Sequence, residues 1–431
     1  MRKIIQLKLK IFAKLILARY KPEIIGITGS VGKTSAKEAI YAVLSTQYKI
    51  RRSVKNYNNE IGLPLTIIGV DSPGRSIVGW LRVFSKVLSL ILFKDKNYPE
   101  ILILEMGVDR PGDMAYLQSI VKPRIGVVTM IGPVHLEFFG SIEGIKKEKI
   151  DLIKRLPQNG WAIINNDDEI LSKTAKEIKG QVLTYGLGEQ ADVRAEDIIF
   201  SFDNDNQEKL QGISFKIRSK GSVTSVLLPK VLGQTAVYAA LAGAAVGVAY
   251  NINLHKISQA LGRFKSPSGR LKLLNGIKGI IIIDDTYNSS PQSVAMALDI
   301  LNQINVKSNG RRIAVLGDML ELGSYSEKAH QEIGQLAVKN KIDKLYLVGK
   351  RSRDIVRGAE KAGMSRDNIF HFSTSDEAKK FVQERIRQND VILIKGSQGM
   401  RMEKIVKEIM AEPMRAEELL VRQSIEWEDT N

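Results

Sequence analysis

The chain has 431 residues, enough for two or three domains that each bury a core of their own. Its hydrophobic content of 44% and charged content of 26% are typical of a globular protein, and the absence of cysteine excludes disulfides and cysteine-bound metals. The formal charge of +17 favours polyanionic partners such as nucleotides, nucleic acid or an anionic membrane surface, although a solvated basic surface explains it equally well.

Residues 1–23, MRKIIQLKLKIFAKLILARYKPE, are basic and partly apolar, and we expect them to form an amphipathic helix. Lys8, Lys10 and Lys14 interrupt the apolar run and no small-residue cleavage site follows, which makes the segment a poor signal peptide. No stretch of the sequence reaches the roughly 18 uncharged apolar residues of a membrane-spanning helix. We therefore expect a cytoplasmic protein.

Apolar strand-like runs alternate with helical stretches over residues 24–266, which predicts an α/β domain with a mostly parallel sheet. The expected buried strands are EIIGIT, EILILEMG, RIGVVTMI and WAIINNDD. Residues 190–230 carry turn residues and a more alternating pattern, which suggests a small antiparallel patch. The run TAVYAALAGAAVGVAY predicts a helix of small residues that packs closely against a neighbour.

A second domain is expected over residues 267–415, after the Ser, Pro and Gly cluster FKSPSGR. Five short strands follow with intervening helices, which is typical of a smaller, doubly wound, Rossmann-like C-terminal domain. The expected strands are GIIIIDDTYN, RRIAVLGDM, KLYLVG, NIFHF and DVILIKGS. Residues 416–431 are expected to be a helical tail.

The stretch GITGSVGKTS, residues 26–35, has the components of a phosphate-binding loop (P-loop) between a strand and a helix. The common pattern, G-x-x-x-x-G-K-[ST], requires Gly at position 27, where this chain has Ile. The shorter form still supplies flexible backbone N–H groups, a helix N-terminus, a lysine and a hydroxyl. The candidate ATP-binding residues are Gly29, Ser30, Val31, Gly32, Lys33, Thr34 and Ser35.

Several further motifs occur in a fixed order along the chain: NYNNEIGLPLT, LEMG, HLEFFGSIEGIKKEKIDLI, GR, DDTYNSSP, LGDMLELG and KGSQGMRME. Together with TGSVGKT they resemble the Mur ligase family, from about residue 24 to about residue 410. Within that family, YNNEIG, DDTYN, LGDMLELG and KGSQGMRME are most similar to the branch that adds D-Ala-D-Ala to a muramyl tripeptide.

The resemblance implies an enzyme of peptidoglycan synthesis that forms an amide bond at the expense of ATP, with Mg²⁺ as cofactor. The expected substrates are an acid like a UDP-muramyl peptide and an amine like D-Ala-D-Ala. A carboxylate is a poor electrophile, so ATP converts it to an acyl phosphate, which the amine then attacks. The charge that develops on the phosphates has to be neutralised by cations.

The resemblance also implies two metal sites. Thr34 and Glu105 correspond to one Mg²⁺ site, and a charge at the end of a buried strand, as at Glu105, is costly unless it is paired or metal-bound. His135 is implied as a ligand of a second Mg²⁺, together with Lys149 in carbamylated form. Lys146 and Lys147 remain alternatives for this lysine, since the segment otherwise resembles a charged helix face. His255, His330 and His371 are expected on helix or loop surfaces.

The resemblance also implies roles for seven further residues. Arg270, Asp285 and Asn288 are expected to meet ATP, with Arg270 also catalytic alongside Lys33, Lys149 and His135. An Asx-rich turn is the alternative explanation of DDTYN. Asn58 and Asn59 are expected on the substrate side, and Lys395 and Ser397 near the incoming amine.

The sequence departs from the family pattern in two places. Thr235, Ala236 and Ala239 stand where the family usually has His and Asn, which puts some nucleotide contacts in doubt. Only about 25 residues precede the loop, too few for the N-terminal domain that grips the UDP-sugar in related ligases, so we expect that domain to be lacking.

Other functions stay open at this point. One is a related ligase that acts on a different acid or amine, such as a folylpolyglutamate or polyamino-acid ligase. Another is a basic nucleotide-binding protein without ligase activity. We expect a monomer and no nucleic-acid partner, because the sequence has no RNA-binding aromatic signature or zinc finger. Residues 1–21 and 77–93 are basic and amphipathic, so they either pack on the core or make weak peripheral membrane contact.

Overall fold

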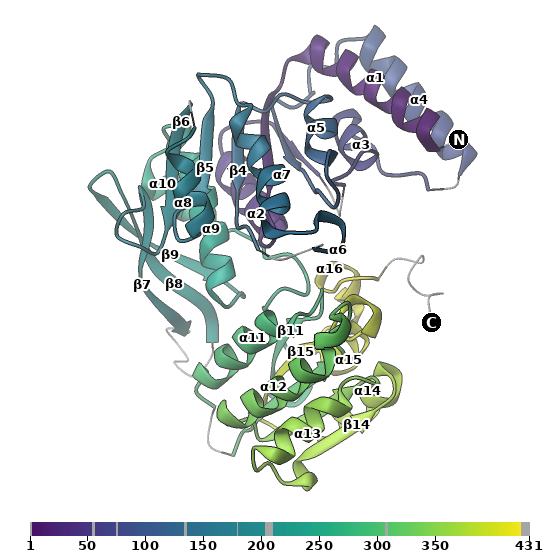
Figure 1. The fold of residues 1–431 in the computed structure, drawn as a ribbon, viewed down its shortest axis with the longest axis vertical. Helices are drawn as coiled ribbons and strands as arrows, with labels where there is room; N and C mark the ends of the chain where they lie inside the picture. The colour runs from purple at the N-terminus through teal and green to yellow at the C-terminus, as the bar shows by residue number, and fades with distance from the viewer. Residues whose placement is uncertain are drawn as a thin grey trace. The chain divides into compact units, whose positions relative to one another are not determined.

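The computed structural model describes residues 2–53, 57–74, 76–132, 136–178, 180–202, 210–306 and 309–423. The chain divides into two compact units (Figure 1). Unit 1 comprises Met1–Ile199, Ser214–Leu228 and Gln234–Lys265. Unit 2 comprises Phe200–Ile213, Pro229–Gly233 and Ser266–Asn431.

Helices and strands alternate through the first part of the chain, as the sequence pattern predicts. The strands are β1 (Glu23–Thr28), β2 (Ile50–Arg52), β3 (Ile101–Glu105), β4 (Ile125–Val128), β5 (Trp161–Asn165), β6 (Gln181–Gly186), β7 (Val193–Phe202), β8 (Leu210–Ser219) and β9 (Ser222–Pro229). The helices are α1 (Arg2–Tyr20), α2 (Lys33–Leu44), α3 (Gly62–Ile68), α4 (Ile77–Leu92), α5 (Asp113–Gln118), α6 (Leu136–Phe139), α7 (Ile142–Lys154), α8 (Glu169–Ala175), α9 (Gln234–Ala249) and α10 (Leu254–Leu261).

These strands form one nine-stranded sheet in the order β2-β3-β1-β4-β5-β6-β7-β8-β9. The pairs from β2 to β7 are parallel, which confirms the predicted fold class. A two-residue turn of Lys220 and Gly221 joins β8 to β9, and the positive φ of both residues suits a tight hairpin. The segment expected to form a small antiparallel patch therefore contributes this hairpin to the edge of the main sheet.

The small-residue helix α9 packs on α2. A methyl group added at Gly243 would come within 2.9 Å of the backbone carbon of Ala39, so the two helix backbones approach closely because glycine and alanine face each other. This contact fixes the middle of α2, the helix that follows the phosphate-binding loop.

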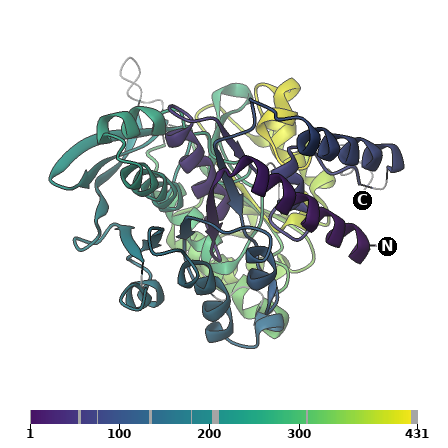
Figure 2. The ribbon, with the colours of Figure 1, turned by 90° about the horizontal axis from the view of Figure 1, so that it is seen from above.

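The helices α1 and α4 lie side by side in unit 1 (Figures 1 and 2). Leu9 and Ile16 of α1 share a core cluster with Val83 and Val87 of α4, and α4 is capped at its start by the hydroxyl of Ser76. Both segments thus pack on the protein's own core through one face. Among the described residues, none of the helices combines the length and the apolar character needed to cross a bilayer.

Unit 2 is built on a six-stranded sheet in the order β10-β11-β15-β12-β13-β14. The strands are β10 (Lys272–Asn275), β11 (Ile281–Asp285), β12 (Arg312–Gly317), β13 (Lys344–Val348), β14 (Ile369–Phe372) and β15 (Val391–Lys395). Its α-helices are α11 (Pro291–Gln303), α12 (Ser326–Lys339), α13 (Arg353–Lys361), α14 (Ser375–Arg385), α15 (Glu403–Ile409) and α16 (Ala416–Leu419). Short 3-10 turns occur at Ile277–Gly279, Gly323–Tyr325, Arg366–Asn368, Gln398–Met400 and Pro413–Arg415.

Successive residues of the central strands point to different cores in unit 2. Ile283 and Leu393 pack with residues of α11, α12 and α13, whereas Ile282 and Ile392 pack with residues of α14 and α15. The sheet is therefore covered on both faces, as expected for a doubly wound domain. Strand β10 was not expected from the sequence, and it pairs antiparallel with β11 at the sheet edge.

Candidate active site

The phosphate-binding loop follows β1, which lies between β3 and β4 in the sheet. Ligands of such sheets bind at the carboxyl ends of the strands, where the strand order reverses. Gly29 has a φ of 148°, and a methyl group added there would lie 2.0 Å from Oγ1 of Thr129, so glycine is required. Gly32, with a φ of 87°, begins α2 without a side-chain cap, which leaves the helix N-terminus suited to an anion.

Residues after β4 hold the loop in place. The backbone N–H of Ser30 donates to the Met130 carbonyl at 2.7 Å, and the Gly132 N–H donates to the Ser30 hydroxyl at 2.9 Å. Oγ1 of Thr129 donates to the Val31 carbonyl at 2.6 Å. These bonds fix the loop before any ligand binds.

Thr34 and Glu105 are brought together from the loop and the end of β3. The Thr34 hydroxyl donates to Oε2 of Glu105 at 3.1 Å, and Nδ2 of Asn58 lies 3.4 Å from Oε1 of the same carboxylate. Glu105 is 3% exposed. Nζ of Lys37 lies 3.7 Å from Oε2 of Glu105, so the buried carboxylate has a cationic neighbour.

The two asparagines expected on the substrate side differ in their surroundings. Asn58 reaches Glu105, as described above. Asn59 instead accepts the backbone N–H groups of Ile61 and Gly62 at 3.2 and 2.9 Å, which anchors the turn before α3. Its side-chain oxygen is therefore engaged locally, away from the Glu105 carboxylate.

Lys149 is the buried lysine of the three candidates on α7. It is 1% exposed, whereas Lys146 is partly buried and Lys147 is exposed. Nζ of Lys149 lies 3.4 Å from the carbonyl oxygen of Gly29, which also accepts Nζ of Lys33 at 2.6 Å. Burial, followed by the charge of Lys33, lowers the pKa of Lys149 to about 7. A large share of this amine is consequently neutral near pH 7.

His135 lies outside the described residues, so its part in a metal site stays a prediction. The expectation for His330 was wrong, because this side chain is fully buried on α12. Its Nδ1 donates to the Ser326 carbonyl at 2.7 Å, and its Nε2 accepts the Met319 N–H at 3.0 Å. The partner of Nε2 comes from the loop after β12 and the partner of Nδ1 from the first residue of α12, and the helical pattern alone does not reveal the loop contact.

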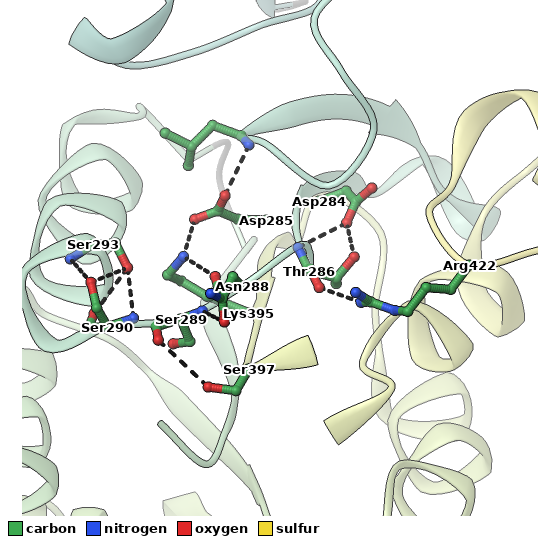
Figure 3. Close-up of polar contacts among 11 residues, drawn as sticks. Asp284, Asp285, Thr286, Asn288, Ser289, Ser290, Ser293, Lys395, Ser397 and Arg422 are labelled. Atoms are coloured by element: carbon green, nitrogen blue, oxygen red, sulfur yellow. Dashed lines mark hydrogen bonds and ion pairs between the residues drawn. The ribbon is translucent and has the colours of Figure 1, made fainter. Parts of the chain in front are cut away.

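In unit 2, polar side chains from the ends of β11 and β15 meet (Figure 3). Nζ of Lys395 lies 2.6 Å from Oδ2 of Asp285 and donates to the Asn288 carbonyl at 2.9 Å. The Ser397 hydroxyl lies 3.5 Å from the Ser289 carbonyl and accepts the Leu320 N–H at 2.9 Å. Asp285 and Asn288, expected to contact ATP, thus lie in one cluster with Lys395 and Ser397, expected near the incoming amine.

Arg270 is positioned by the turn before β10. The Gly269 N–H donates to Oδ2 of the buried Asp284, and the Tyr287 N–H donates to the Gly269 carbonyl at 3.0 Å. Burial raises the pKa of Asp284 to about 6. The guanidinium of Arg270 lies 4.2 Å from the centre of the Tyr287 ring, so the turn and the DDTYN segment hold each other within unit 2.

Three residues in or beside these clusters were not foreseen. In the sequence, Lys37 has the appearance of a solvent-facing helix residue. No sequence pattern indicates that its side chain reaches Glu105. Thr129 follows a buried strand, and that strand-end position could have identified it as a loop contact. Arg422 donates to the carbonyl of Thr286 (Figure 3). It also donates to the carbonyl of Tyr287 and pairs with Glu403 at 2.8 Å. Nothing in the sequence near Arg422 marks it.

Comparisons with known proteins point to one family. The family model described as the Mur ligase middle domain matches residues 27–76 and 85–247, and the model described as the Mur ligase, glutamate ligase domain matches residues 269–398. The UDP-N-acetylmuramoyl-tripeptide–D-alanyl-D-alanine ligase of Bacillus subtilis is 32% identical over 402 residues. That match covers 93% of this chain and 79% of the relative.

Solved structures resemble this chain over most of its length. A crystal structure of MurF from Acinetobacter baumannii has a TM-score of 0.76 and 27% identity, and the match covers 95% of this chain and 80% of that one. MurF ligase from Thermotoga maritima in complex with ADP has a TM-score of 0.74 and 26% identity, over 94% of this chain and 83% of that one. Both domain models match in order, and the Bacillus subtilis relative aligns with 93% of this chain, so the chain belongs to the Mur ligase family.

Proposed function

We propose that this protein joins D-alanyl-D-alanine to the terminal carboxylate of UDP-N-acetylmuramoyl-tripeptide, with ATP as the energy source and Mg²⁺ as cofactor. The observation that carries the proposal is the assembly around one loop of Lys33, the Thr34–Glu105 pair and the buried amine of Lys149. It is supported by the length over which the chain matches ligases with this name.

The reaction has two steps. A carboxylate oxygen of the acid attacks the γ-phosphorus of ATP, the bond to the β–γ bridging oxygen breaks, and ADP leaves. The amine nitrogen then attacks the carbonyl carbon of the acyl phosphate, phosphate leaves with the carbon–oxygen bond electrons, and the nitrogen loses a proton. Lys33 and the N–H groups at the start of α2 neutralise the charge of the phosphates during transfer.

The donor set at Thr34 and Glu105 fits Mg²⁺. A hydroxyl and a carboxylate 3.1 Å apart offer hard oxygen ligands, and Mg²⁺ usually takes only one or two carboxylates and keeps several waters. The ion would supply charge neutralisation at the β- and γ-phosphates when bound. Nζ of Lys37, 3.7 Å from Oε2 of Glu105, gives this buried carboxylate a cationic neighbour.

Lys149 has the properties that carbamylation requires. Carbon dioxide adds to a neutral amine, which forms a nitrogen–carbon bond and releases one proton, and the product is an anionic carbamate. The lowered pKa supplies the neutral amine, and neighbouring Lys33 would stabilise the resulting negative charge. The carbamate would provide two hard oxygens for a second Mg²⁺, with His135 as a further predicted ligand.

The other site residues remain predictions. Arg270, Asp285 and Asn288 are proposed to contact the nucleotide. Lys395 and Ser397 are proposed to serve the incoming amine. The ion pair of Lys395 with Asp285 suggests that these two functions are coupled through one cluster. Of the substrate-side asparagines, Asn58 is the stronger candidate, since Asn59 is engaged in a turn.

Release of ADP under defined substrate mixtures tests the proposal. We expect release to depend on ATP, Mg²⁺, UDP-muramyl-tripeptide and D-Ala-D-Ala together, and to fall to background when either the acid or the amine is omitted. Folate with glutamate serves as the comparison pair for a related ligase. Release with that pair alone would contradict the proposed substrates, and no release with any pair would contradict ligase activity.

A further inference from the structure

The helix α1 carries an apolar stripe that faces away from the core. Ile4, Leu7, Ile11 and Leu15 recur every three or four residues and are 61%, 59%, 47% and 47% exposed. At 100° per residue they lie on the side of the helix opposite the buried positions Leu9, Ala13 and Ile16. One helix face therefore serves the core and the other presents aliphatic side chains to solvent.

The helix α4 repeats this arrangement. Val78, Leu81, Leu88 and Leu92 are 59%, 63%, 57% and 59% exposed. They also lie opposite the buried side chains of their own helix, Val83, Val87 and Leu90. Single exposed apolar residues are ordinary, but two ordered stripes on neighbouring helices form a contiguous patch that marks an interaction surface.

The two helices are fixed beside each other, so the stripes form one surface. The rings of Phe12 and Phe84 make an edge contact at 5.9 Å. The Tyr20 hydroxyl at the end of α1 donates to the Leu90 carbonyl near the end of α4 at 3.0 Å. Both views show the helices adjacent (Figures 1 and 2). We call the eight exposed aliphatic side chains of α1 and α4 the apolar platform.

The charged side chains of α1 and α4 themselves are all positive. Neither α1 nor α4 contains an acidic residue. The helical angle places Lys3 and Lys14 along one border of the α1 stripe and Lys8 and Arg19 along the other, and Arg82 borders the α4 stripe. All five are exposed. Aliphatic side chains between flanking lysines suit insertion just below a layer of anionic headgroups, with the amines reaching up to the phosphates.

We propose that the apolar platform docks the protein on an anionic lipid membrane surface, with α1 and α4 lying in the plane of the interface. Pairing of two copies through this face is disfavoured, because it would bring the two sets of lysines and arginines together. Spanning the bilayer is not required, and the lysines interrupt any long apolar run. Each cation near an anionic surface strengthens binding about fivefold, so the flanking charges account for much of the attraction.

Sedimentation of the full chain with lipid vesicles tests this docking. We expect co-sedimentation with vesicles of phosphatidylcholine and phosphatidylglycerol in equal amounts at low salt. Binding should fall as salt rises, and it should be weak with pure phosphatidylcholine. An apolar variant, Leu7→Ser, Leu81→Ser and Leu88→Ser, should lose vesicle binding. A basic variant, Lys3→Gln, Lys8→Gln and Lys14→Gln, should weaken it about fivefold for each charge removed.

Matched controls separate docking from a general effect of exposed residues. The control variants replace exposed residues elsewhere, Ile199→Ser, Val223→Ser and Met414→Ser for the apolar set and Lys328→Gln, Lys361→Gln and Lys380→Gln for the basic set. Both should bind vesicles like the parent, and all four variants should melt like the parent because the altered side chains are exposed.

Absence of binding at low salt would overturn the proposal. Equal binding to neutral vesicles, or equal loss in the controls, would also overturn it. So would self-association that only the apolar variant abolishes, without vesicle binding.

Discussion

The side-chain nitrogen of Lys149 lies 3.4 Å from the carbonyl oxygen of Gly29, an oxygen that also accepts the amine of Lys33 at 2.6 Å. Two lysines therefore converge on the first glycine of the phosphate-binding loop. The amine of Lys33 comes from the first residue of α2, where the loop ends, whereas the amine of Lys149 comes from α7 and is buried. Their mutual repulsion and the burial make the neutral form of Lys149 accessible near pH 7.

Replacement of Lys149 by alanine should remove most of the ligase activity, because the proposed carbamate is lost. Short carboxylates such as acetate or propionate should restore part of it by occupying the vacated space with an anionic group. Rates of ADP release with and without added carboxylate measure this effect. Lys146→Ala, on the same helix but partly exposed, is the control and should stay active. Full activity of Lys149→Ala would remove the carbamate from the mechanism.

The lowered pKa of Lys149 also predicts how stability changes with pH. An unfolded lysine keeps a pKa of 10.5, whereas the folded value is about 7. Between these values the unfolded chain binds one more proton at this site, so stability rises with pH across the window. Below about pH 7 the cost of burying the charged amine is fully present.

The variant Lys149→Met should therefore be more stable than the parent at pH 6, by on the order of 5 kcal/mol, and the difference should shrink toward pH 10. Denaturant unfolding without nucleotide, in buffers free of carbon dioxide, measures this difference. If the free energies of unfolding of the two proteins changed with pH in the same way, Lys149 would have to stay charged in the folded state.

Lys33→Ala should leave the fold intact and lower turnover by at least about a hundredfold, because the loop loses the cation that faces the phosphates. The side chain is only partly buried, so the melting temperature should stay close to that of the parent. Melting curves and steady-state rates together give the answer. Near-normal turnover by a folded Lys33→Ala protein would show that this loop does not hold the reacting phosphates.

Arg422→Ala should destabilise unit 2 by about 2 kcal/mol. The guanidinium is 5% exposed at its side chain and bridges Glu403 and the carbonyls of Thr286 and Tyr287, so its loss leaves buried acceptors unpaired. Arg415→Ala, whose partners are exposed, should cost no more than about 0.5 kcal/mol. Equal effects of the two substitutions on denaturant unfolding would show that Arg422 does not anchor the DDTYN segment.

Features that are contiguous in the sequence could be predicted, and features that depend on distant packing could not. The loop was identifiable because its glycines, lysine and threonine follow one another between a strand and a helix. Glu105 was identifiable because it ends an apolar strand. By contrast, the burial of Lys149 is hidden in KKEKIDLIK, which has the pattern of a solvated helix face. Its environment is created by the loop that α7 packs against.

The same limit applies to unit 2. Asp285 and Lys395 lie 110 positions apart, and their ion pair exists because β11 and β15 are neighbours in the sheet. The tail residue Arg422 reaches the segment after β11 from 136 positions away. No local pattern encodes either contact, although each strand end was recognisable by itself.

Transfer of heavy oxygen from the acid to phosphate is the most direct test of the proposed ligase. The terminal carboxylate of UDP-muramyl-tripeptide is labelled with heavy oxygen and incubated with the protein, ATP, Mg²⁺ and D-Ala-D-Ala, and the released phosphate is analysed by mass spectrometry. An acyl phosphate route predicts that each amide bond formed yields one phosphate carrying one labelled oxygen. Phosphate without label, or phosphate released at the same rate in the absence of D-Ala-D-Ala, would contradict it.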